Sequence, residues 1–151
     1  MRQGMRARYD FFKVKGYITE FVNEYSVFDE RYPSNFTYFG ERWESIEQAY
    51  NNMKEDSFNE SQKLNLMGNI LYAFYKQNDV AAAMLISTKD MWLEKKVKNH
   101  DNFWHNCTCA ECFLDMGENN YGRLLMEIRD RLIWERKPYF KGKKNWVKKY
   151  F

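Results

Sequence analysis

Glycine, proline and cysteine are scarce in this chain of 151 residues, and long apolar runs are missing from it. Seven glycines and two prolines are too few for a collagen-like or a Pro/Gly-rich disordered chain. No apolar run approaches the roughly 18 residues that a membrane-spanning helix needs, so we expect no membrane partner. The first residues are basic but lack the apolar core and cleavage site of a secretory signal, which predicts a cytoplasmic protein, or one of the host cytoplasm if the gene is viral.

Aromatic side chains are abundant instead, at 19% of the residues, and such a composition favours a folded globule. At this length we expect one domain, which buries roughly 70% of the surface of its unfolded chain. Residues 136–151 carry seven Lys and Arg and no acid, so against the net charge of +3 the rest of the chain sums to −4. A mildly acidic body, residues 1–135, is therefore followed by a basic, aromatic C-terminal tail, residues 136–151.

Hydrophobic periodicity predicts several helices and a few short strands. The expected helices cover about 45–56, 67–75, 80–86 and 121–132, and the expected strands lie in 11–21 and 91–97. Asn119 or Asn120 is the expected N-cap of the last helix. These elements predict an α+β fold, a mainly helical single domain around a small antiparallel sheet.

The most informative segment is 32–54, where aromatic residues, a glycine turn and a helix start follow one another. Ser45 and Gln48 fit a capping box, which puts Glu47 in the first turn, where the helix dipole favours a negative charge. The polar residues that share one face of this helix are Glu47, Tyr50, Asn51 and Lys54. Such a face is either an ordinary solvated surface or the wall of a pocket, and the aromatic run that ends in Trp43 favours the pocket.

Two motifs further along the chain add polar and aromatic candidates. Asp101 and Trp104 stand in D-x-F-W, just before the cysteines. The segment 117–129 opens a helix with glycines and asparagines, whose free backbone N–H groups can receive a phosphate, and two arginines can add bidentate contacts. The candidate ligands there are Asn119, Gly122, Arg123 and Arg129. An ordinary capped helix start is the alternative.

Taken together and in this order, these motifs resemble the YbiA/NADAR-like family of N-glycosidases. The matching runs are VF-x-x-x-YPSNFTYFG at 27–40, W-x-SIEQAY-x-x-x-K at 43–54, QN at 77–78, D-x-FW at 101–104 and G-x-N-x-x-GRLLMEIR at 117–129. The resemblance covers about residues 25–132 and implies a NADAR-like domain over 1–135. Family members cleave the bond between a ribose C1 and a nitrogen, in riboflavin-pathway intermediates or in ADP-ribose attached to nucleic-acid bases.

This chemistry suits the residues present, because departure of a base from ribose builds positive charge on the sugar. The resemblance implies that Glu47 stabilises this charge or handles the proton. Asp101 is then a general base or an orienter of ribose hydroxyls. Lys54 binds phosphate or attacks C1 to form a Schiff base. The rings expected to stack on a base or line the ribose site are Trp43, Tyr50 and Trp104, although each is also explained as ordinary core.

Several departures from the family pattern leave a second hypothesis for the function open. His105 follows the D-x-F-W tryptophan where glycine is usual, the segment between Lys54 and Gln77 is short, and Phe74 replaces the usual lysine. The triplet 29–31, Asp-Glu-Arg, stands where the family tends to have Ser-Asn-Phe or Ser-Gln-Trp. The alternative is therefore a catalytically inactive module that binds ADP-ribose or nucleic acid.

The cysteines of the chain, Cys107, Cys109 and Cys112, fall within six residues. Their odd number and the expected reducing compartment argue against disulfides. With His105 they form H-x-C-x-C-x-x-C, a possible structural zinc site, and His100 lies a little further back. Free thiols are the alternative, and no cofactor is required by the resemblance.

The tail interleaves seven cations with aromatic rings, as single-stranded nucleic acid binding requires, or is simply a solvated terminus. It favours ADP-ribosylated nucleic acid over a free ribosyl phosphate metabolite as the partner. A small zinc-stabilised interaction protein is a third possibility. The sequence does not indicate an oligomeric state.

Overall fold

A computed structural model describes residues 16–136 of the chain. The basic tail from 137 onward, and the first part of the expected strand region 11–21, lie outside the described residues. In chain order the elements are β1 (Tyr17–Ile18), η2 (Asn23–Phe28), β2 (Phe36–Tyr38), β3 (Glu41–Trp43), α2 (Ile46–Met53), α3 (Glu60–Gln77), α4 (Asp79–Ser87), β4 (Trp92–Leu93), β5 (Lys96–Val97), β6 (Asn106–Cys107) and α5 (Asn120–Arg136). None of these helices is both long and apolar enough to cross a membrane.

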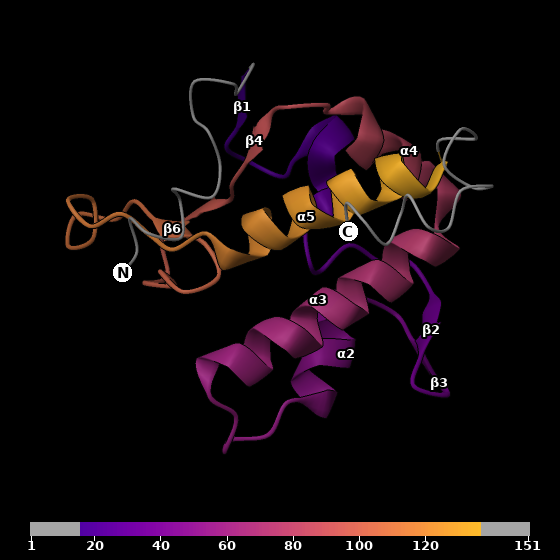
Figure 1. Cartoon of the computed structure of the whole chain (residues 1–151). Helices are drawn as coiled ribbons and strands as arrows, with labels where there is room; N and C mark the ends of the chain where they lie inside the picture. The colour runs from indigo at the N-terminus through magenta and orange to yellow at the C-terminus, as the bar shows by residue number, and fades with distance from the viewer. Residues whose placement is uncertain (1–15, 137–151) are drawn as a thin grey trace, which may run out of the picture.

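Helix α5 is the central element of the fold. Figure 1 shows it running through the middle of the molecule, with α3 and α2 on one side and α4, β1 and β4 on the other. Its apolar side chains Leu125, Met126 and Leu132 are buried in the same core as Ile70 and Leu71 of α3. Burial of apolar surface on two sides of one helix stabilises the domain and makes α5 the frame on which the other segments are placed.

The fold is α+β, as the sequence predicts, but its strands do not form one antiparallel sheet. They form three two-stranded pairs, of which β2–β3 is an antiparallel hairpin while β1–β4 and β5–β6 are parallel. The expected strand over 91–97 is divided into β4 and β5, which pair with different partners. Short strands of this kind depend on the helices that pack against them, because isolated two-stranded pairs are marginal in water.

Local capping explains where α2 begins. The Ser45 hydroxyl accepts the backbone N–H of Gln48 at 3.1 Å, and the Gln48 side chain accepts the backbone N–H of Glu44 at 2.7 Å. The backbone N–H of Glu47 donates to the carbonyl of Glu30 at 2.8 Å. This last bond joins the first turn of α2 to the segment after η2, so Glu47 and Glu30 lie close together.

Candidate functional site

A cavity of about 730 Å³ opens between α2 and the segment around β5 and D-x-F-W, a size within the usual range for small-molecule sites. Its wall is rich in charge. The lining residues are Glu30, Arg31, Glu47, Tyr50, Asn51, Lys54, Met67, Lys95, Lys96, Val97, Lys98, Asn99, Asp101, Trp104, His105 and Tyr121. Three carboxyl groups and five Lys or Arg side chains thus surround one space, which suits an anionic polar ligand.

The cavity brings together six of the residues that the sequence singles out, from two segments far apart in the chain. These are Glu47, Tyr50, Asn51 and Lys54 of α2 and its C-cap, with Asp101 and Trp104. The rings of Tyr50 and Trp104 meet edge to face, with centroids 5.4 Å apart. Lys54 is exposed, with its Nζ 5.9 Å from the centroid of the Tyr50 ring. The prediction of a pocket wall on this helix face agrees with the geometry.

Asp101 has a structural task in this wall. Its Oδ1 accepts the backbone N–H groups of Phe103 and Trp104, at 3.1 and 2.9 Å. This fixes the turn that carries the Trp104 ring to the cavity. Burial, and then the charge of Asp101, raise the pKa of the Tyr50 phenol, so Tyr50 stays a neutral hydrogen-bonding group at neutral pH.

A charged network that the sequence does not predict lies behind Glu47. Lys95 Nζ lies 2.9 Å from Asp29 Oδ2 and 3.1 Å from Glu30 Oε1, and His105 Nε2 lies 3.1 Å from the same Glu30 oxygen. Burial raises the pKa of Glu30, but the hydrogen bond and charge of His105 and the charge of Lys95 outweigh it, so the pKa is lowered and the carboxylate stays ionised. Glu30 Oε2 is buried and has no hydrogen-bond partner within residues 16–136.

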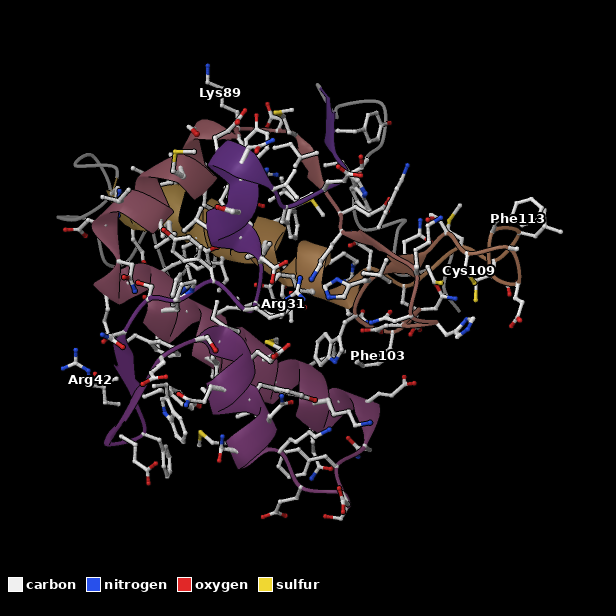
Figure 2. The ribbon with its side chains drawn as sticks, turned by 180° about the vertical axis from the view of Figure 1, so that it is seen from behind. Arg31, Arg42, Lys89, Phe103, Cys109 and Phe113 are labelled. Carbon is white, nitrogen blue, oxygen red and sulfur yellow. The ribbon has the colours of Figure 1, made fainter. Side chains whose placement is uncertain are left out.

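Glu47 differs from Glu30 in its surroundings. Its side chain is half-buried, and within the described part of the chain no hydrogen bond or ion pair holds its carboxylate. Figure 2 shows Arg31, which lines this cavity, near the middle of the molecule. Glu47 therefore offers its carboxylate to the cavity, whereas Glu30 is held by protein partners.

Tyr121 connects the two walls of the cavity. Its phenol donates to the carbonyl of Phe28 at 2.6 Å, and its backbone N–H donates to the carbonyl of Trp104 at 3.0 Å. The His105 ring packs edge to face on the Tyr121 ring, with centroids 5.5 Å apart. Position 105 is therefore occupied by a buried imidazole that lines the cavity and holds Glu30.

Trp43 is not a cavity residue. It lies in β3, where its indole Nε1 donates to the carbonyl of Tyr38 at 3.2 Å and its ring packs partly buried on the core. Trp43 thus lies apart from this cavity, and its stacking on a base stays a prediction. The aromatic run before α2 forms a hairpin that faces Gln77, whose side-chain oxygen accepts the Thr37 backbone N–H at 2.8 Å.

The start of α5 is also not a phosphate site. The backbone N–H groups of residues 118, 120 and 121 donate to the carbonyls of Asn102, Phe103 and Trp104. Asn119 is fully buried and its side-chain amide donates to the Leu93 carbonyl at 2.9 Å. A Cβ at position 122 would overlap the same carbonyl, so Gly122 permits close packing of α5 on β4. The backbone N–H groups at the start of α5 that lack a partner within the helix bind the D-x-F-W segment, so they are not available to an anion.

Arg123 and Arg129 are buried in the body of the protein and do not line the cavity. Arg123 lies 3.2 Å from Asn120 Oδ1 and 3.9 Å from Glu127 Oε1. Arg129 Nη1 donates to Thr88 Oγ1 at 2.9 Å and to the Met91 carbonyl at 2.7 Å. Both guanidinium groups have protein acceptors, and Arg123 lines a different, second cavity, so their binding of substrate phosphate stays a prediction. Arg31 and the lysines at 95, 96 and 98 supply the cations instead.

The cysteines gather beside the cavity, but with a different histidine from the expected one. His100 Nδ1 lies 3.3 Å from Cys112 Sγ and 3.4 Å from Cys109 Sγ, while His105 contacts Glu30. The four possible metal-binding atoms of His100, Cys107, Cys109 and Cys112 lie within 4.8 Å of one another. The sequence-based choice of His105 is therefore corrected to His100, and the group is compatible with a structural zinc ion.

Comparison with solved structures finds a protein of the same fold. The NMR structure of the Escherichia coli protein YbiA superposes with a TM-score of 0.67 over 87% of this chain and 92% of that one, at 20% sequence identity. The chain has the YbiA fold. At this identity the YbiA fold is shared while side chains differ widely. No protein-family model matches the chain, and no curated protein matches it in sequence.

Sequence reasoning missed the basic side of the cavity. The lysines at 95, 96 and 98 form a short run after a buried strand, a pattern that indicates a charged edge, but no motif includes them. The triplet 29–31 stands out in the sequence as a departure from the family, yet two of its members line the cavity. Neither the lysine run nor the triplet indicates a site until the fold shows that both segments line the same cavity as α2.

Proposed function

We propose that this protein is an N-glycosidase that hydrolyses the bond between a ribose C1 and a base nitrogen, with ADP-ribose on a nucleic-acid base as the preferred substrate. One observation carries the proposal: a single cavity combines an uncommitted carboxylate, an aromatic pair and five cations. A phosphorylated ribosyl compound needs cations for its phosphates, rings for its base and a carboxylate beside its C1. The YbiA fold supports the proposal at the level of the fold.

Each of the cavity residues has its own role in binding or catalysis. Arg31, Lys54, Lys96 and Lys98 hold the phosphates, and the Tyr50 and Trp104 rings pack against a base. Glu47 lies beside C1, stabilises the positive charge on the sugar and takes a proton from the attacking water. The water oxygen bonds to C1 as the C1–N bond breaks, and the leaving nitrogen keeps the bond electrons and receives the proton that Glu47 took from the water. Glu30 Oε2, which is buried without a partner in 16–136, accepts a ribose hydroxyl.

A release assay tests this function. Purified protein is incubated with DNA ADP-ribosylated on guanine and, separately, with a ribosylated riboflavin-pathway intermediate, and free ADP-ribose or ribose 5-phosphate is measured. We expect wild type to release product and Glu47→Gln to lose at least about 100-fold of the rate, as removal of a general base does. Glu55→Gln is the matched control, because Glu55 is exposed just after α2 and lies outside the cavity wall.

The outcome separates the two candidate functions. No release by folded wild type that still binds ADP-ribose would replace the N-glycosidase with a binding module. Equal release rates for Glu47→Gln and Glu55→Gln would show that Glu47 takes no part in the reaction. Release from only one of the two substrates would identify the substrate class.

A further inference from the structure

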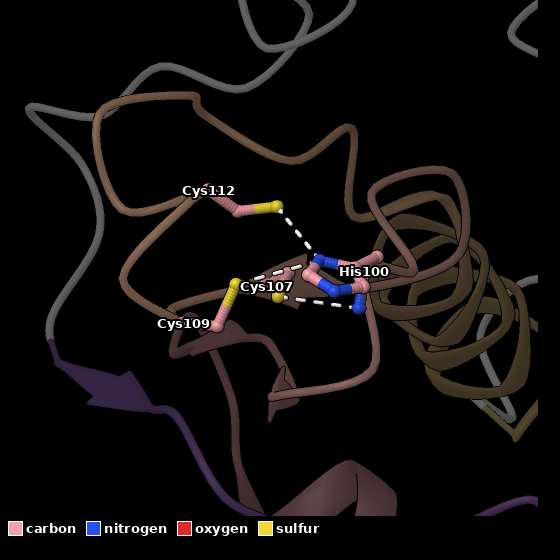
Figure 3. A group of neighbouring side chains, drawn as sticks. All are labelled: His100, Cys107, Cys109 and Cys112. Atoms are coloured by element: carbon pink, nitrogen blue, oxygen red, sulfur yellow. Dashed lines mark hydrogen bonds between the residues drawn. The ribbon is translucent and has the colours of Figure 1, made fainter.

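The strongest site outside the cavity is the group of His100, Cys107, Cys109 and Cys112, at the end of the molecule from which the loop with Phe113 projects (Figure 2). Figure 3 shows the imidazole of His100 and the sulfur atoms turned toward a common centre. Every pair of their ligand atoms lies within 4.8 Å. None of the thiols is in a disulfide.

Hydrogen bonding alone does not account for this convergence. His100 Nδ1 lies 3.3 Å from one sulfur and 3.4 Å from another. An imidazole nitrogen carries either one proton or one lone pair, so it makes one good hydrogen bond and not two. Two sulfurs that approach one nitrogen equally are what a cation at their centre produces. The third sulfur, of Cys107, is buried and accepts the backbone N–H of His100 at 3.3 Å.

We propose that these four side chains bind one zinc ion, with His100 Nδ1 and the sulfur atoms of Cys107, Cys109 and Cys112 as ligands. Zn–S bonds of about 2.3 Å and a Zn–N bond of about 2.0 Å in a tetrahedron put nitrogen and sulfur roughly 3.5 Å apart. The two nitrogen–sulfur distances of His100, 3.3 and 3.4 Å, are close to this value. Three soft thiolates and an imidazole select zinc among the common divalent ions.

The choice of His100 also removes a geometric difficulty of the sequence motif. Ligands at 105–112 would have to close a tetrahedron within eight neighbouring residues, whereas His100 brings the fourth ligand from a separate turn. His100 has a φ of 66°, a left-handed conformation that an L-residue adopts at a cost. The Cys107 backbone N–H is held by Asn102 Oδ1 at 2.8 Å, which positions this ligand from the neighbouring segment.

The role of the ion is structural, because four protein ligands leave no open position for water. Between Lys98 and Met116 the buried side chains are those of His105 and Cys107, while Phe113, Leu114 and Met116 are exposed. This segment therefore lacks an apolar core of its own, and small segments of this kind need a disulfide or a metal to hold one conformation. His100 directly precedes Asp101, so the ion fixes one end of the cavity wall.

Metal analysis of the full-length protein, purified under reducing conditions and dialysed, tests the site. We expect about one zinc ion per chain. His100→Ala and Cys109→Ser should each lower the zinc affinity by more than the roughly 10–100-fold that loss of an outer-shell partner costs. His105→Gln and Glu111→Gln are the controls, since the former removes the other histidine and the latter an exposed residue between two ligands. Both should keep zinc.

Cobalt replacement keeps the proposal testable if a ligand variant does not fold. Wild type stripped by a chelator and loaded with Co²⁺ should show the visible bands of a tetrahedral ion and thiolate-to-cobalt charge transfer. Absence of metal from the reduced protein, or a disulfide between two of the cysteines in it, would overturn the site. Loss of zinc in His105→Gln, with retention in His100→Ala, would overturn the ligand set.

Discussion

The glycine at position 122 allows a sharp test of how α5 is placed. A Cβ there would overlap the carbonyl oxygen of Leu93 and come within 2.5 Å of Asn119 Oδ1. Neither neighbour can withdraw easily, because one is backbone and the other is a fully buried side chain. Overpacking of this kind costs about 1–3 kcal/mol, against at most about 1 kcal/mol gained from the better helix propensity of alanine. We expect Gly122→Ala to destabilise the protein by about 1–2 kcal/mol.

Gly68 is the matched control, since it is also a helical glycine. A Cβ at this position in α3 meets Leu124 Cδ2 at 3.5 Å, an ordinary contact. Gly68→Ala should therefore stabilise the protein by about 0.5–1 kcal/mol. Urea unfolding followed by tryptophan fluorescence measures both free energies. The reasoning about close packing would be refuted if the two variants shifted stability in the same direction.

Two other perturbations follow from buried charges. Burial raises the pKa of Asp29, but hydrogen bonds from Arg31 and Lys95 outweigh burial and lower the pKa from 3.8 to about 2. The ionised carboxylate therefore contributes about 2 kcal/mol to the free energy of unfolding above pH 4, and this contribution is lost as the pH falls to about 2. Urea unfolding across this pH range should show a steeper loss of stability for wild type than for Asp29→Asn, and parallel curves would contradict the assignment. Arg129→Ala leaves a cavity and two acceptors without a donor, so we expect a loss of about 3–5 kcal/mol, against at most about 1 kcal/mol for the half-exposed Arg131→Ala. Thermal unfolding compares these arginine variants, and equal losses would show that burial does not decide the effect.

Local patterns in the sequence were sufficient to locate the long helices and one wall of the site, although α3 begins at Glu60 and not near the expected residue 67. The capping residues around Ser45 set the start of α2, and that start decides which side chains share a face with Glu47. Motif order linked this face to Asp101 and Trp104, and the cavity contains all of them. The α+β class followed from the same elements.

Properties that depend on long-range pairing could not be read from the sequence. The strands are two or three residues long, so their partners are decided by the helices that carry them and not by their own alternation. The glycines and asparagines before α5 have the pattern of an anion site, but the fold brings backbone carbonyls to the same donors. His105 is nearer to the cysteines in sequence than His100, but the turn at His100 brings the more distant histidine to the sulfur atoms.

The two hydrogen bonds of Tyr121 fix the spacing of two segments that lead into the cavity wall. One residue holds the Phe28 carbonyl with its phenol and the Trp104 carbonyl with its backbone N–H, so the chain just before Glu30 and the D-x-F-W segment stay about one tyrosine side chain apart. Moving these segments apart breaks at least one of the bonds, each worth about 1 kcal/mol. This part of the cavity is therefore set by the native fold before any ligand arrives.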